Sequence, residues 1–94
     1  MEFETVPGTD RGDLKLYALS TCVWCKKTKK LLDELGVKYA YVFVDKLEGA
    51  SKQSARDEVK RWNPACSFPT LVIDNHRCIV GFKEHEIKEA LGSA

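Results

Sequence analysis

The sequence predicts one α/β domain, in which a four-stranded mixed sheet carries helices on both of its faces. Residues 37–44 form a β-branched and aromatic run that is typical of a mostly buried strand. Residues 23–35 repeat apolar side chains at helical spacing, through Thr28, Leu31, Leu32 and Leu35. The polar stretch 74–77 separates two short apolar runs and therefore predicts a hairpin.

The first half of the domain reads as strand, helix and strand. The first strand, 14–19, is apolar with partial alternation and ends at a Ser-Thr pair whose hydroxyls can cap a helix. The helix 23–35 ends at Gly36, because glycine readily takes the left-handed conformation that follows a last helical turn. Together with the strand 37–44 these elements form a βαβ unit, whose two strands run parallel.

The second half reads as helix, hairpin and helix. A polar loop, 45–52, leads to a second helix with three apolar side chains on one stripe, Ala55, Val59 and Trp62. Two short strands, 70–73 and 78–80, add an antiparallel hairpin to the sheet. A last helix, 84–91, ends at Gly92.

The remaining residues and the composition define the domain organisation. Residues 1–13 contain Pro7 and two glycines without periodicity, so we expect an irregular N-terminal arm before a single domain at 14–92. The 94 residues leave room for one core. A hydrophobic share of 44% with 31% charged residues is typical of a folded globular protein.

Charge and hydropathy argue against two classes of partner. The 15 basic and 14 acidic residues give a net charge of +1, whereas nucleic-acid binding usually brings a basic excess. No apolar run approaches the roughly 20 residues of a membrane helix, and the N-terminus lacks the pattern of a secretory signal. We therefore expect a cytoplasmic protein with no nucleic-acid and no membrane partner.

Cys22 and Cys25 flank two residues at the expected turn from the first strand into the first helix. The first helical turn has free backbone N–H groups and the positive end of the helix dipole, which stabilise a thiolate. We expect Cys22, at the helix start near Lys26 and Lys27, to be the attacking thiolate. Cys25, one turn further in, is then the resolving thiol of a redox-active Cys22–Cys25 disulfide, and no other cofactor is expected.

Half of a zinc site is the alternative explanation for this cysteine pair. It requires two more ligands, for which the candidates are Cys66, Cys78, His76 and His85. Cys66 and Cys78 do not repeat the two-residue spacing, and a CxxC motif at a strand-to-helix turn is typical of redox proteins. We therefore expect no metal ligands. For Cys66 itself, a secondary redox site and an ordinary loop cysteine both stay open.

Pro69 stands directly before the third strand, where the missing N–H of a proline is tolerated. A cis peptide bond at Pro69 presents the backbone of Phe68 beside the thiols, where it can pair with an extended substrate. A trans proline that merely begins the strand is the alternative.

Three motifs together resemble the glutaredoxin branch of the thioredoxin superfamily: Thr21-Cys22-Val23-Trp24-Cys25, Phe68-Pro69-Thr70 and Val80-Gly81-Phe82. The resemblance covers residues 14–92 and implies a thioredoxin fold, with the four strands in the order 2-1-3-4. It also implies a nucleophile at Cys22, a resolving thiol at Cys25 and the cis-proline at Pro69. The substrate-contacting residues that it implies are Trp24, Phe68, Pro69, Gly81 and Phe82.

The function implied by this resemblance is that of an enzyme, a monomeric thiol–disulfide oxidoreductase. It reduces protein or small disulfides and takes electrons from a thiol or from a reductase protein. Some glutaredoxins instead hold a [2Fe–2S] cluster between two subunits, and the departure from the family's usual proline at Val23 keeps this alternative open.

Other departures from the family concern glutathione. Leu19 stands where the family carries a basic residue for the glutathione carboxylate, and Phe82 replaces the second of two glycines. We therefore expect a donor other than glutathione. The Gly81-Phe82 pair is similar to the glutaredoxin-like hydrogen donors of ribonucleotide reductase. Lys15, Lys60 and Arg61 are the candidates for holding a small anionic thiol.

Overall fold

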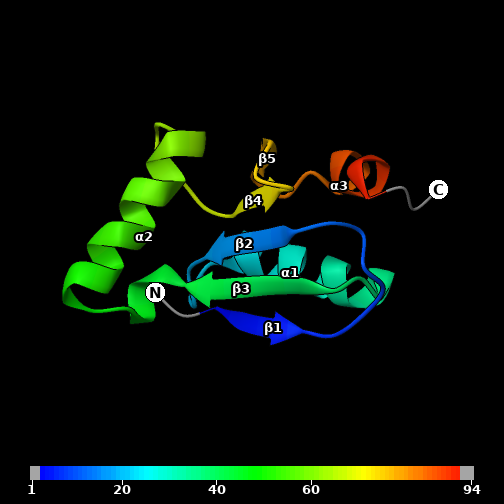
Figure 1. Ribbon diagram of the computed structural model, residues 1–94, viewed down its shortest axis with the longest axis horizontal. Coiled ribbons are helices and arrows are strands. Elements are labelled where there is room, and N and C mark those ends of the chain that lie inside the picture. The colour runs from blue at the N-terminus through cyan, green and yellow to red at the C-terminus, as the bar shows by residue number, and fades with distance from the viewer. Residues whose placement is uncertain (1–2, 92–94) are drawn as a thin grey trace.

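The computed structural model describes residues 3–91 (Figure 1). Gly92, the expected end of the last helix and of the domain, lies outside the described residues. The fold class is the expected one, a mixed sheet combined with three α-helices. The elements are β1 (Glu4–Val6), β2 (Leu14–Ala18), α1 (Val23–Leu35), β3 (Tyr39–Phe43), a 3-10 helix (Val44–Lys46), α2 (Gly49–Trp62), β4 (Thr70–Ile73), β5 (Arg77–Val80) and α3 (Glu84–Ala90).

The sheet has the strand order β1-β3-β2-β4-β5. β2 and β3 run parallel across the α1 crossover, with Leu16 opposite Tyr41. The β4–β5 hairpin is antiparallel, and β4 also pairs antiparallel with β2. The four predicted strands therefore lie in the predicted order, and β2 is central among them. Its carboxyl end leads directly into the cysteine pair.

The number of strands is a correction, because four were expected and five are present. β1 comes from the segment predicted to be irregular, and it pairs antiparallel with β3 through Glu4 and Tyr41. Gly8 lets the chain continue close to β3, since a Cβ atom there would lie 2.5 Å from the Val37 carbonyl carbon. The Thr9 N–H then donates to the Gly36 carbonyl, and the Thr9 carbonyl accepts from the N–H of Lys38, directly before β3. Three residues are too few to show the alternation by which a strand is recognised in a sequence.

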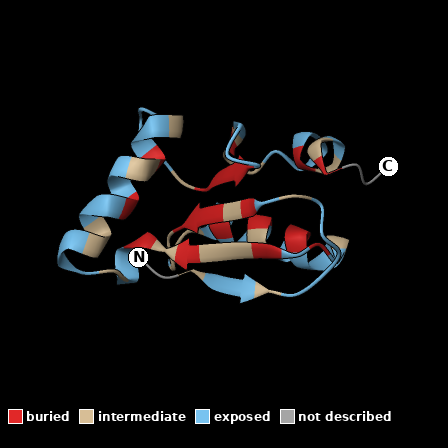
Figure 2. Cartoon of the chain, viewed as in Figure 1, coloured by how far each residue is buried: buried red, intermediate tan, exposed pale blue. Residues whose placement is uncertain are grey.

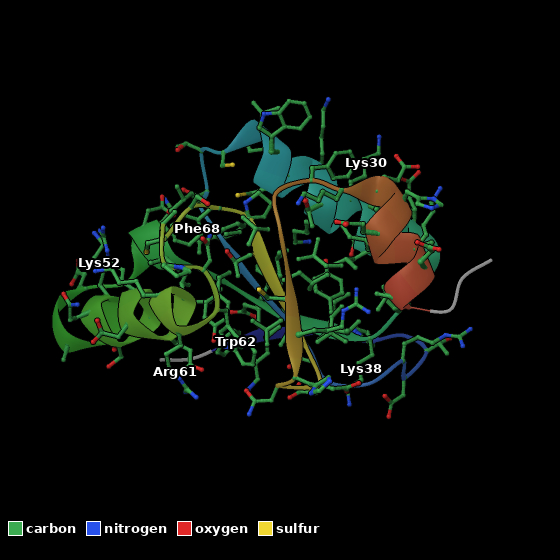
Figure 3. All side chains as sticks on the ribbon, turned by 90° about the horizontal axis from the view of Figure 1, so that it is seen from above. Lys30, Lys38, Lys52, Arg61, Trp62 and Phe68 are labelled. Carbon is green, nitrogen blue, oxygen red and sulfur yellow. The ribbon has the colours of Figure 1, made fainter. Side chains whose placement is uncertain are left out.

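Each face of the sheet has its own apolar core. In Figure 3, α2 lies on one side of the sheet, while α1 and α3 lie on the other. Leu32 and Ile87 bring the latter two helices onto one face, where both side chains are fully buried. Val59 brings α2 onto the opposite face. Burial is concentrated on the central strands, whereas β1 is largely exposed (Figure 2).

The ends of the helices show which sequence signals predicted a helix boundary correctly. α1 has the predicted bounds, and Gly36 follows it with a φ of 68°. α2 begins at Gly49, inside the stretch 45–52 that was predicted to be a loop, and no side chain caps it. Its start is therefore set by the packing of its apolar stripe rather than by a capping residue.

Leu32→Ala tests this account of the core. Removing a fully buried leucine side chain between α1 and the sheet should lower the free energy of unfolding by about 2–5 kcal/mol. Urea denaturation with an unchanged slope measures this loss. Val23→Ala, at a position 60% exposed on the same helix, is the control and should change stability by less than about 0.5 kcal/mol. Equal losses in both variants would contradict the packing described here.

Candidate active site

Cys22 is the N-cap of α1. Its backbone is extended, with φ −87° and ψ 120°, and its Sγ accepts a hydrogen bond from the backbone N–H of Cys25 at 3.2 Å. The Cys22 carbonyl accepts the first bond of the helix, from the N–H of Lys26 at 3.1 Å. The sulfur thus occupies the position of a capping oxygen, where the free amides of the first turn stabilise a negative charge.

Cys25 lies one turn inside the helix and is only 1% exposed. The N–H of Leu19 donates to its Sγ at 3.4 Å. Burial, and after it the hydrogen bond with Cys22, raises the pKa of Cys25 to about 12, although the N–H of Leu19 acts in the opposite direction. Both cysteines are free thiols in this structure. The pair therefore divides into a half-buried thiol at the helix start and a protonated, covered one behind it.

Asp45 fixes the loop that carries Cys22. Its carboxylate accepts hydrogen bonds from the backbone N–H of Ser20, at 2.8 Å, and from the Ser20 hydroxyl. These bonds, the hydroxyl first, lower the pKa of Asp45. The carboxylate comes from the 3-10 helix after β3, so it ties the segment following β2 to the neighbouring parallel strand. The sequence analysis treated this residue as part of a polar loop.

The Phe68–Pro69 peptide bond is cis, as expected. The Pro69 carbonyl accepts a hydrogen bond from the N–H of Gly81 at 2.8 Å, which joins two of the predicted substrate-contacting residues. Asn63 holds this loop from the end of α2: its buried amide group donates to the Ser67 hydroxyl at 2.9 Å and to the Ser67 carbonyl at 3.1 Å. The sequence analysis assigned no role to Asn63.

A pocket of about 430 Å³ joins the loop before Cys22 to the Phe68–Pro69 loop. Its cationic lining residues are Lys52 and Arg56, which α2 presents one turn apart. The other lining residues are Leu19, Val44, Asp45, Cys66, Ser67 and Phe68. The predicted anion-binding residues Lys15, Lys60 and Arg61 do not line this pocket. The sequence analysis overlooked Lys52 and Arg56, whose i, i+4 spacing places two positive charges on one face of α2.

Trp24 and Phe82 lie together on the other side of the motif. Their rings stack at 6.2 Å with an interplanar angle of 22°, and Trp24 is 55% exposed. Phe82 therefore does not line the pocket that Leu19 lines. Of the two departures from the family noted above, the one at Leu19 lies in this pocket, whereas the one at Phe82 lies against Trp24.

The remaining cysteines lie away from the pair. Cys66 and Cys78 pack against the core on the α2 side, whereas Cys22 and Cys25 belong to the core on the α1 side. Within residues 3–91, no three His, Cys, Asp or Glu side chains gather in a way that could hold a metal ion. The geometry of the described residues therefore does not support the zinc alternative. In the same part of the chain, no helix has the length and apolar character needed to cross a bilayer.

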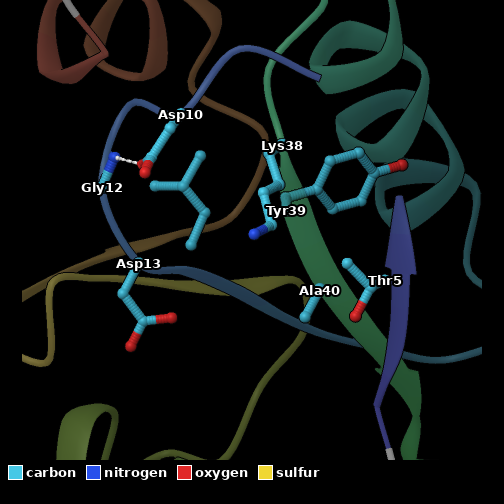
Figure 4. A pocket seen from close by; sticks show the side chains of 8 residues that line it. Thr5, Asp10, Gly12, Asp13, Lys38, Tyr39 and Ala40 are labelled. Carbon is cyan, nitrogen blue, oxygen red and sulfur yellow. Dashed lines mark hydrogen bonds between the residues drawn. The ribbon is translucent and has the colours of Figure 1, made fainter. Parts of the chain in front are cut away.

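Another pocket, of about 450 Å³, lies at the other end of the central strands, away from the cysteine pair (Figure 4). Leu14 and Tyr39 line it at the starts of β2 and β3, while Cys22 follows the carboxyl end of β2. Asp10, one of its two acidic lining residues, accepts a hydrogen bond from the N–H of Gly12 at 2.9 Å. This pocket is therefore separate from the thiol chemistry.

Comparison with known proteins agrees with this geometry. A family model described as glutaredoxin matches residues 14–79. The chain belongs to the glutaredoxin family. Among curated relatives of this glutaredoxin, an uncharacterized glutaredoxin-like 8.6 kDa protein in the rubredoxin operon of Clostridium pasteurianum is 32% identical over 78 residues. The match covers 83% of this chain and 96% of the relative.

Solved structures extend the similarity over nearly the whole glutaredoxin chain. The glutaredoxin from Methanosarcina mazei Go1 is 56% identical, with a TM-score of 0.91, and the match covers 98% of this chain and 89% of that one. Methanosarcina acetivorans methanoredoxin is 55% identical, with a TM-score of 0.92, and the match covers 98% and 96% of the two chains. The expected thioredoxin fold is thereby confirmed.

The buried thiol makes the stability of the reduced protein depend on alkaline pH. The unfolded chain loses the Cys25 proton near the ordinary pKa of 9.0, while the folded chain keeps it up to about 12. The folded state binds more protons between these two pKa values. The contribution of Cys25 to the free energy of unfolding is therefore fully present below pH 9 and is lost as the pH rises towards 12. Buried Tyr17, with a pKa raised to about 12, adds to the loss.

Cys25→Ala isolates the cysteine's share of this loss. Urea denaturation under reducing conditions should show the parent losing up to about 1.4 kcal/mol per pH unit more than the variant between pH 9 and 12. The difference in slope matters here, because the substitution also changes packing at every pH. Parallel pH profiles for parent and variant would contradict the protonated, buried state of Cys25.

Proposed function

We propose that this glutaredoxin is a thiol–disulfide oxidoreductase that reduces protein or small disulfides with Cys22 as nucleophile and Cys25 as resolving thiol. The supporting observation is the N–H of Cys25 donating to the Cys22 sulfur at the start of α1, with the Cys25 thiol buried behind it. The redox-active pair serves in place of a cofactor. We propose further that the protein acts as a monomer in the cytoplasm, without nucleic-acid or membrane partners.

The proposed cycle moves two electrons. The Cys22 thiolate attacks one sulfur of the substrate disulfide; a Cys22–substrate disulfide forms, and the other substrate sulfur leaves as a thiolate. Cys25 then gives up its proton to a departing thiolate and attacks the Cys22 sulfur. The second substrate thiol is released, and the Cys22–Cys25 disulfide remains. Two thiol equivalents of a donor reduce this disulfide and complete the cycle.

The substrate disulfide is proposed to approach between the cis-proline loop and the start of α1. The backbone of Phe68, at the loop held by Pro69 and Gly81, is suited to pair with an extended chain. Trp24 and Phe82 offer an aromatic surface on the other side of Cys22. No observation on residues 3–91 favours the iron–sulfur alternative.

The proposed electron donor is a small anionic thiol other than glutathione, or a reductase protein. In the pocket that Leu19 and Phe68 line, Lys52 and Arg56 offer positive charge from α2. Leu19 lines the same pocket at the position where the family carries a basic residue. A single acidic group on a small thiol finds a partner on α2, whereas the glutathione carboxylate lacks its usual partner on the loop before Cys22.

Serine variants separate the roles of the two cysteines. Cys22→Ser should abolish the reduction of every disulfide, because it removes the only thiolate at the start of α1. Cys25→Ser should stop the two-thiol route and accumulate mixed disulfides at Cys22, which intact-mass spectrometry detects as the added mass of the substrate. Cys78→Ser, on the opposite face of the sheet, is the control and should keep turnover. Turnover by Cys22→Ser would move the nucleophile elsewhere, with Cys66 the first suspect.

A donor comparison tests the role of Leu19. At matched concentrations and with the same disulfide substrate, glutathione should support slower turnover than a thiol with one acidic group. Leu19→Lys should raise kcat/KM for glutathione about tenfold or more, since a charged hydrogen bond contributes about 1.5–3 kcal/mol. Leu19→Met is the control for changed packing. Efficient turnover of the parent protein with glutathione alone would contradict the proposed donor preference.

A further inference from the structure

The exposed face of α1 carries both hydrophobic and basic side chains. Val23 and Trp24 are the large hydrophobic side chains most open to solvent in the described residues, at 60% and 55% exposure. Lys26, Lys27 and Lys30 are exposed as well. Val23 and these lysines follow the i, i+3, i+4, i+7 spacing, so they form one stripe that begins beside Cys22.

The positive charge of this stripe is not neutralised within the described part of the chain. Neighbouring cations have partners: Lys29 pairs with Asp33, Lys83 with Glu86 and Lys88 with Glu84. None of the three lysines of the stripe makes such a pair with a described residue. The stripe therefore carries three positive charges, although the net charge of the whole chain is only +1.

Aromatic contacts hold part of this face in place. Trp24 stacks on Phe82, and Nζ of Lys27 lies over the Trp24 ring, 4.6 Å from its centroid. Beyond the rings a groove of about 330 Å³ runs between α1 and α3, with Lys27, Lys30 and Phe82 among its lining residues. Figure 3 shows Lys30 on α1 at the side of α3. Its acidic lining residues are Glu34 on α1 and Glu84 on α3, and the Glu84 carboxylate pairs with Lys88.

We propose that this face, formed by Val23, Trp24, Phe82, Lys26, Lys27 and Lys30, docks an acidic segment of a protein whose disulfide Cys22 reduces. The proposal rests on the proposed function and names the partner class of the same site. An apolar side chain of the partner covers the two aromatic rings, and its carboxylates face the lysines. Charge complementarity of this kind accelerates association and orients the partner.

The dimensions and the chemistry favour a protein segment over other anions. From Val23 to Lys30 the stripe is about 10 Å long at 1.5 Å per residue, which spans several partner residues rather than one anionic group. A nucleic acid would match the charge, but it offers no disulfide to the thiol at the head of the stripe. The small-thiol pocket with Lys52 lies on the other side of Cys22, so the two surfaces do not compete for the same residues.

The experiment uses two cyclic disulfide peptides that share one sequence around the disulfide and one leucine. Three glutamates flank the disulfide in the acidic peptide, and three lysines flank it in the basic peptide. The reduced protein should reduce the acidic peptide at least about tenfold faster at low salt. This ratio should fall towards one near 1 M salt, because the Debye length is then about 3 Å and charges further apart than this are largely screened.

Charge-reversal variants locate the effect. Lys26→Glu with Lys30→Glu should bring the rate ratio of acidic to basic peptide to one or below. The control, Lys38→Glu with Lys60→Glu, changes the net charge equally at exposed positions outside this face and should keep the parent ratio. Using a ratio within each variant removes differences in folded fraction and in thiol reactivity.

Four results would be decisive. Equal rates for the two peptides with the parent protein, or an equal change in both double variants, overturn the docking surface while leaving the proposed function intact. Failure to reduce either peptide overturns the proposed function instead. A salt-dependent preference for the acidic peptide that only the Lys26/Lys30 variant loses establishes the docking surface.

Discussion

The backbone N–H of Cys25 donating to the sulfur of Cys22 is the contact on which the site depends. Oxygen side chains are the usual caps at the first turn of a helix, and a neutral thiol accepts a hydrogen bond less strongly. The contact gains strength when the sulfur carries a negative charge, because charge-assisted hydrogen bonds are shorter and stronger. The helix start is therefore stabilised most in the state that attacks a disulfide. Moving the sulfur by one residue would remove it from the free amides.

The fold keeps this contact in place from several directions. α1 is fixed by its apolar side chains on the sheet, and the loop before Cys22 is held by Ser20 against Asp45. The loop at Pro69 is held by Gly81 and by the buried amide of Asn63. Each anchor lies on a different element, and all of them meet where β2 ends. A reactive loop thus rests on a rigid sheet, which is the usual division between scaffold and site.

The features predicted from the sequence are those that depend on residues close together in the chain. Helix α1 was predicted with its observed bounds because its apolar spacing and Gly36 are local signals. β1 escaped prediction because its three residues are ordered by pairing with β3, which lies far away in the sequence. Lys52 and Arg56 escaped because a polar helix face does not reveal which pocket it will line. Features that depend on residues close together in the sequence were predictable. Features that depend on contacts between elements far apart in the sequence were not.

In the proposed cycle, the pocket with Lys52 and the face with Trp24 and the α1 lysines explain how the Cys22 sulfur reacts with two different partners in turn. A dithiol cycle needs a disulfide to be reduced and, afterwards, a donor to restore the thiols, and both must reach the same atom. Trp24 and Lys27 contact each other in the first turns of α1, whereas Leu19 and Phe68 line the pocket on the side of α2. Because Cys25 is buried, Cys22 is the sulfur of the pair open to attack from either side. Two approaches to one half-buried sulfur let the surface for each partner differ in size and in apolar character, while the attacking geometry at the helix start stays the same.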